Sequence, residues 1–172
     1  MAYAQSYDHL VQVTAGDDPA HNLQLKAEIK ADEVFNAGAP ITLEAASGKW
    51  VAAGKNTDKT RVICMAVNGT ADLDVDSGDE YNTANATAIG AFPCTGNFEF
   101  KTTEFKSGSY AVNDKLSPSE VATEEGLLIE ETGVLGNTGY CGIVTKLAFT
   151  QKGYATDFIQ FLGVYFPGHA HA

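Results

Sequence analysis

Short apolar runs separated by turn residues constrain the fold of this 172-residue chain more than any other feature. In residues 23–30, four apolar side chains alternate with four polar ones, the period of a strand with one buried face. Seventeen glycines supply many tight turns between such runs. Similar runs recur at residues 41–43, 50–53, 61–67, 97–105, 127–129, 141–149 and 157–166. The pattern predicts a mainly all-β protein, built as a small β-barrel or β-sandwich.

One segment departs from this pattern and predicts a short helix near residues 117–125. Ser117 is suited to cap the first turn, and Pro118 fits the first helical position. Glu120 lies three residues after the cap, as in a capping box. Gly126 is a typical residue just beyond the end of a helix.

The chain divides into an N-terminal arm, one domain and a tail. Residues 1–22 hold an apolar run that a Gly-Asp-Asp-Pro sequence interrupts, so they form either an extended arm ordered against a neighbour or a first strand at residues 10–14. Residues 23–168 form a single β-rich domain, and residues 169–172 are the tail. Within the domain, residues 68–96 are small, polar and acidic, and too long for an ordinary loop, which predicts an acidic insertion.

The net charge of −11 is concentrated in two segments. Residues 71–80 and residues 120–131 each carry five acidic residues and no basic one, which leaves 12 acidic and 11 basic residues elsewhere. An acidic surface repels phosphate backbones and anionic lipids. We therefore expect neither nucleic acid nor a membrane as a partner, and attribute the charge mainly to solubility.

The cysteines and the first residues indicate the cellular compartment in which the chain folds. Cys64, Cys94 and Cys141 are far apart and form no CxxC motif, so we expect buried free thiols rather than a disulfide framework. The first residues have neither the basic nor the apolar region of a signal peptide. No apolar run reaches the ~18 residues of a membrane helix. These features predict assembly in a reducing cytoplasm.

Two groups of residues could in principle bind a metal ion. Asp72, Asp74 and Asp76 provide oxygen ligands at regular spacing, although the segment departs from an EF-hand loop. His169 and His171 could face one transition metal, and three copies on an axis would supply six imidazoles. A solvated acidic hairpin and a frayed tail explain the same residues, so the sequence predicts no metal and no cofactor.

The sequence contains no recognisable catalytic arrangement. All four histidines lie near the ends of the chain, and there is no GxSxG or P-loop motif. The acidic residues lie in runs that we expect to be exposed, rather than in pairs suited to general acid–base catalysis. We expect a protein that is not an enzyme; the enzymatic alternative is a small acidic hydrolase with a site built from distant residues.

Aromatic residues are dense in the last quarter of the chain. The apolar residues of 158–166 do not alternate cleanly, so a strand there would carry apolar groups on both faces. One face could pack on the core and the other on a second copy of the chain. The predicted subunit-interface residues are Phe158, Phe161, Tyr165 and Phe166. Ordinary core packing is the alternative interpretation.

Six short stretches resemble the small head decoration, or cement, proteins of tailed bacteriophages. They are AGAPITLEA from Ala37, GKWVAAG from Gly48, the apolar run at 61–67, NDKLS from Asn113, GLLI from Gly126 and YCGIVTK from Tyr140. The resemblance covers about residues 35–165. The acidic insertion and the aromatic C-terminus depart from the family pattern.

The resemblance implies a non-enzymatic β protein, commonly a homotrimer, on the outer capsid surface of the virion. Assembled in the host cytoplasm, it would bind the major capsid protein where capsomers meet, and many weak contacts on the lattice would act together. Such proteins commonly use an N-terminal arm to bind the shell. By position, the residues that this implies are Tyr3, Tyr7, Leu10 and Val11.

The alternative is a head-fibre, carbohydrate-binding or receptor-binding β module of a virion. In that case exposed aromatic side chains would stack on sugar rings. Trp50 and Tyr154 are the residues that the sequence offers for this role.

Overall fold

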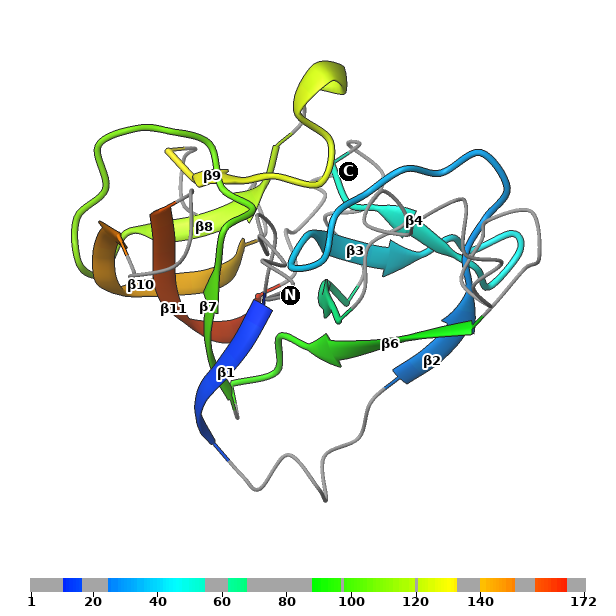
Figure 1. Cartoon of the computed structure of the whole chain (residues 1–172), viewed down its shortest axis with the longest axis horizontal. Helices are drawn as coiled ribbons and strands as arrows, with labels where there is room; N and C mark the ends of the chain where they lie inside the picture. Colours follow the sequence, from blue (N-terminus) through cyan, green and yellow to red (C-terminus); the bar gives the residue numbers. More distant parts are fainter. Residues whose placement is uncertain are drawn as a thin grey trace, which may run out of the picture.

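The computed structural model describes residues 11–16, 25–54, 62–67, 88–96, 98–119, 121–132, 140–150 and 157–166. These residues form eleven strands and one short 3-10 helix (Figure 1). The elements are β1 (Val11–Gly16), β2 (Leu25–Glu28), β3 (Pro40–Leu43), β4 (Trp50–Ala52), β5 (Cys64–Ala66), β6 (Ala88–Pro93), β7 (Phe98–Thr102), β8 (Lys115–Pro118), η3 (Ala122–Glu124), β9 (Leu128–Glu130), β10 (Tyr140–Thr150) and β11 (Asp157–Phe166). The predicted all-β class is confirmed. No helix within the described ranges has the length and apolar character needed to cross a membrane.

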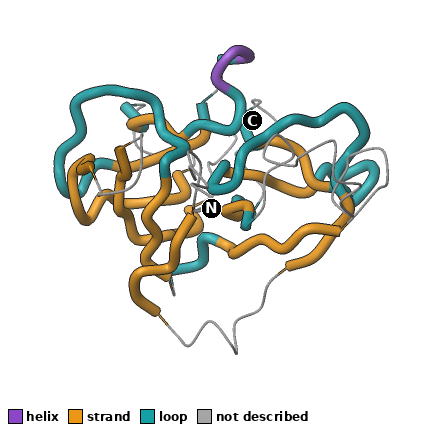
Figure 2. The backbone as a smooth tube through the Cα atoms, viewed as in Figure 1, coloured by secondary structure: helices purple, strands orange, loops and turns teal. Residues whose placement is uncertain are grey.

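The strands form two antiparallel sheets that lie on the left and right of Figure 1. The six-stranded sheet has the order β1-β7-β11-β10-β8-β9, and the five-stranded sheet has the order β2-β6-β5-β3-β4. Figure 2 shows that long loops connect the strands of both sheets. Residues from different parts of the chain therefore become neighbours on each sheet.

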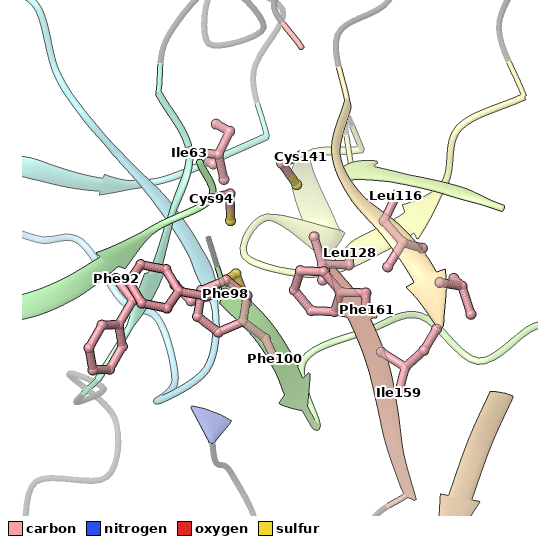
Figure 3. Close-up of a cluster of buried hydrophobic side chains, with 13 residues drawn as sticks. Ile63, Phe92, Cys94, Phe98, Phe100, Leu116, Leu128, Cys141, Ile159 and Phe161 are labelled. Carbon is pink, nitrogen blue, oxygen red and sulfur yellow. The ribbon is translucent and has the colours of Figure 1, made fainter. Parts of the chain in front are cut away.

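The main core joins the two sheets (Figure 3). It contains Met65 and Phe92 from the five-stranded sheet and the rings of Phe98, Phe100 and Phe161 from the six-stranded sheet. A second cluster around Trp50 and Ile41 covers the other face of the five-stranded sheet. In β5, Met65 packs in the first cluster while Cys64 and Ala66 pack in the second, so the five-stranded sheet is buried on both faces.

Two glycines that face each other across β10 and β11 make room for this core. Gly142 pairs with Gly163 in the register of these strands. A Cβ on Gly142 would lie 2.5 Å from Cδ2 of Phe161, and a Cβ on Gly163 would lie 2.6 Å from Cε2 of Phe100. The two rings pack at 5.5 Å between centroids. A glycine at each position therefore allows a phenylalanine ring to lie directly against the strand.

The six-stranded sheet curls back on itself. Directly after β7, Phe105 forms a parallel bridge with Leu128 of the edge strand β9. The Leu128 N–H donates to the Glu104 carbonyl at 3.0 Å, and the Lys106 N–H donates to the Leu128 carbonyl at 2.9 Å. The far edge of the sheet is thus hydrogen-bonded to the segment that follows β7.

The predicted helix at residues 117–125 is wrong in extent. Ser117 and Pro118 belong to β8, where they pair with Ile129 and Leu128 of β9. The Ser117 hydroxyl donates to a Glu131 carboxylate oxygen at 2.9 Å rather than capping a helix. Among the described residues of this segment, only Ala122–Glu124 are helical, in a single 3-10 turn.

The structure also differs from the predicted boundaries of the N-terminal arm and of the acidic insertion. Residues 11–16, assigned to the arm, form β1, which pairs antiparallel with β7, so the alternative of a first strand is confirmed. Residues 88–93, assigned to the acidic insertion, form β6 in the interior of the five-stranded sheet. The reason is apolar burial, because Ile89 and Ala91 are core residues. Residues 68–87 lie outside the described part of the chain.

Candidate functional site

A hydrogen-bonded group of polar side chains lies on the face of the six-stranded sheet that points away from the core. Glu99 of β7 accepts hydrogen bonds from Thr14 of β1 at 3.0 Å and from Thr145 of β10 at 2.5 Å. Gln160 of β11 donates to the Thr14 hydroxyl at 3.4 Å. We call these four residues the Glu99 network. It links four neighbouring strands across the surface.

The network stabilises a negative charge at its centre. The hydrogen bond from Thr145 is the main factor that lowers the pKa of Glu99, and hydrogen bonds from Gln160 and Thr14 add to it. Partial burial opposes them by favouring the neutral form. Because donors favour the ionised carboxylate, Glu99 is an anion at neutral pH.

Lysine side chains cover aromatic rings beside the network. The Lys101 ammonium lies 5.1 Å from the centroid of the Phe158 ring, and the Lys146 ammonium lies 4.1 Å from that of Phe149. The two rings stack at 6.0 Å with an interplanar angle of 28°. Within a chain of net charge −11, this face therefore combines one carboxylate with two cations.

Strand β1 forms an edge of the same sheet. It pairs with β7 from Val11 opposite Thr102 to Gly16 opposite Phe98, with a bulge between Val13 and Ala15. In the described part of the chain, no strand pairs with its other side. Such an edge offers backbone donors and acceptors to a further strand.

A cavity of about 280 Å³ lies where β10 ends and β11 begins. It opens between the β10–β11 hairpin and the loop that follows β7, and its lining residues are Thr103, Phe105, Ser107, Gly108, Ala148 and Asp157. Asp157 accepts a hydrogen bond from the Thr150 hydroxyl at 2.7 Å. The cavity thus contains a carboxylate, hydroxyl groups and an aromatic ring.

The three thiols are buried and free, as predicted. Burial is the main factor that raises the pKa of Cys64 to about 12. A hydrogen bond with Cys141, together with burial, raises the pKa of Cys94. Figure 3 shows Cys94 and Cys141 in the main core. Because the thiolate is the reactive form, Cys64 and Cys94 should react slowly, and burial also shields Cys141 from reagents.

The structure places two of the predicted interface residues inside the chain. Phe158 and Phe161 are both 0% exposed. Phe161 packs in the main core, and Phe158 lies on the other side of β11 beneath Lys101 and beside Phe149. This corrects the prediction that these rings face a second copy, because the chain's own side chains cover them. Tyr165 and Phe166 end β11.

Most of the predicted arm and metal residues lie outside the described part of the chain. This holds for Tyr3, Tyr7 and Leu10 of the arm and for Asp72, Asp74, Asp76, His169 and His171. Val11 belongs to β1, opposite Thr102. Among the described residues, no group of three or more histidine, cysteine or acidic side chains is arranged to hold a metal ion.

Trp50 is not available for sugar stacking. Its side chain is 0% exposed, and its indole N–H donates to the Ile89 carbonyl at 3.2 Å. It therefore stabilises the second core cluster, which corrects the prediction of an exposed platform. Tyr154, the other candidate, lies outside the described residues.

A buried carboxylate was not anticipated from the sequence. Glu104 is 3% exposed, and its oxygens accept hydrogen bonds from Asn36 at 2.9 Å and from Thr103 at 3.0 Å. These contacts give Glu104 a structural role after β7. The Glu99 network and the cavity were also missed, although the alternation of residues 97–105 already places Glu99 and Lys101 on one face.

No protein-family model matches the sequence, and a search of curated proteins finds no significant relative.

Proposed function

We propose that this chain is a non-enzymatic head decoration protein of a tailed bacteriophage. It binds the outer surface of the mature capsid and contacts the major capsid protein where capsomers meet. It acts as a homotrimer on the virion after assembly in the host cytoplasm. The proposal extends the sequence resemblance.

The position of β1 is the observation that carries the proposal. Strand β1 is the edge strand next to β7, and no other strand of the described residues pairs with its outer side. Edge backbone groups can pair with an extended segment of another protein. The ladder to β7 and the contact of Thr14 with Glu99 hold this edge in place. A shell-binding arm would thus begin from a fixed point.

The curled six-stranded sheet supports the finer fold expected for this class. We infer a small barrel in which the bridge between Phe105 and Leu128 brings β9 close to the end of β7. Phe158 and Phe161 are buried within the chain. Of the four predicted interface residues, Tyr165 and Phe166 therefore remain as candidates for a trimer contact.

Binding to heads tests the proposal. Deletion of residues 1–10 removes the part of the predicted arm that precedes β1 and leaves the residues of β1 in place. We expect the full chain to saturate expanded, undecorated heads of its own phage in co-sedimentation, and the deletion to weaken binding at least about tenfold. Deletion of the tail 169–172 is the matched control and should leave binding unchanged. A full chain that ignores the heads contradicts the function, and an arm deletion that binds fully contradicts the role of the arm.

The oligomeric state is tested separately by sedimentation equilibrium, alone and after release from heads. A trimer has three times the 18.2 kDa mass of one chain. A chain that stays monomeric in both states contradicts the trimer.

A further inference from the structure

We propose that the cavity between the β10–β11 hairpin and the loop after β7 binds one neutral sugar unit of a glycan. The inference is independent of capsid binding, because the cavity is formed within a single chain. Its volume of about 280 Å³ is close to the lower limit of small-ligand sites, ~300 Å³. That space suits a single ring rather than a long chain.

The polar groups of the cavity match a ligand that both donates and accepts hydrogen bonds. The Ser107 hydroxyl lines the cavity and is exposed, so its O–H can donate to a ligand. Asp157 uses Oδ1 to accept from Thr150, and its other oxygen can accept from a ligand. A sugar hydroxyl satisfies both groups, whereas an ammonium group only donates and leaves the serine donor unused.

The remaining walls suit the C–H face of a sugar ring. Phe105 and Ala148 provide apolar surface beside the polar groups. The Phe105 ring packs edge-on against Tyr110 at 5.8 Å, and the Tyr110 hydroxyl donates to the Lys106 carbonyl at 2.6 Å. The loop is therefore held in shape by its own contacts, which reduces the entropy lost when a ligand binds.

Charge selects the class of sugar. Asp157 lines the cavity, and the chain has a net charge of −11. An acidic sugar would bring a second carboxylate close to Asp157, and the two negative charges would repel each other. A neutral hexose or N-acetylhexosamine avoids that repulsion.

Titration of the full-length, isotope-labelled chain tests the inference. The probes are glucose, galactose, N-acetylglucosamine and, as the ammonium alternative, butylamine, each followed by amide chemical shifts. We expect at least one sugar to give saturable shifts at Ser107, Gly108, Ala148 and Asp157. Asp157→Asn should weaken that binding at least about tenfold, because the amide side chain keeps an oxygen for Thr150 but loses the charged acceptor.

Asp32→Asn is the matched control. Asp32 is exposed on a turn with a φ of 66°, a conformation that asparagine tolerates well. This variant removes the same charge away from the cavity and should bind like the original chain. A second variant, Ala148→Leu, fills the cavity and should abolish the shifts.

Three results would overturn the inference. They are the absence of saturable shifts with all three sugars, sugar shifts that persist unchanged in Asp157→Asn and Ala148→Leu, and saturable binding of butylamine without binding of any sugar. None of these results bears on head binding, which is measured with a different partner.

Discussion

Replacement of Gly163 by alanine tests how tightly the main core is built. The new Cβ would lie 2.6 Å from Cε2 of Phe100 and 3.2 Å from Cα of Cys94. Phe100 is fully buried between Phe98 at 5.9 Å and Phe161 at 5.5 Å, so its ring cannot move aside freely. The second obstacle is main chain, which no side-chain rotation relieves. We therefore expect a cost near the upper end of overpacking, about 3 kcal/mol.

Part of this cost is offset in the unfolded state. Alanine restricts the unfolded chain more than glycine does, which stabilises the folded form by about 0.4–1 kcal/mol. The net expectation is a loss of about 2 kcal/mol. For a chain of this size, that lowers Tm by roughly 4–8 °C. Thermal unfolding followed by circular dichroism and urea titration measures both quantities.

Gly108→Ala is the matched control. A Cβ at Gly108 would lie 3.6 Å from Cε2 of Tyr110, an ordinary van der Waals contact. The same chemical change should therefore leave stability unchanged or raise it by up to about 1 kcal/mol. If both alanine variants unfold at the same temperature, the packing argument is refuted.

The remaining predictions concern the Glu99 network, the thiols and Trp50. Because hydrogen bonds lower the pKa of Glu99, its contribution to stability is present above the unfolded carboxyl pKa of about 4.3 and is lost as pH falls through the folded value. Thr145→Val should therefore make the loss of urea stability between about pH 5 and pH 3 shallower, and an unchanged pH profile would contradict the network. The cysteines should react slowly with a disulfide reagent in the native chain and all three should react in urea; rapid native labelling would contradict their burial. Trp50→Phe should cost about 1–3 kcal/mol in urea titration, because it removes the indole hydrogen bond to the Ile89 carbonyl and leaves space in the second core cluster; a variant as stable as the original chain would refute this role.

Strands were predicted from the sequence because their signal is local. The run at residues 157–166 has the same bounds in β11, and residues 25–28 of the first alternating run form β2. The capping signals of Ser117 and Pro118 are also local, but pairing of β8 with β9 overrides them. A helix start and a strand end use the same residue types, so only the partner strand distinguishes the two outcomes.

The burial of Phe158 could not be derived from periodicity. An apolar side chain on the second face of a strand needs a cover, and the sequence does not say whether another subunit or the chain itself provides it. Here Phe149 stacks on the ring and Lys101 lies over it. Both covers come from neighbouring strands, so they depend on sheet order rather than on the sequence around Phe158.

The Glu99 network depends on register in the same way. Its hydrogen bonds join residues that are 85, 46 and 146 positions apart in the sequence, so no local sequence motif predicts the network. In β7, burial of Phe98 and Phe100 forces Glu99 to the outer face. A slip of one residue would exchange these faces, burying the carboxylate and breaking the bonds to Thr14 and Thr145. The alternation that builds the core therefore also fixes the outer face, and through Thr14 it fixes the edge strand from which the N-terminal residues extend.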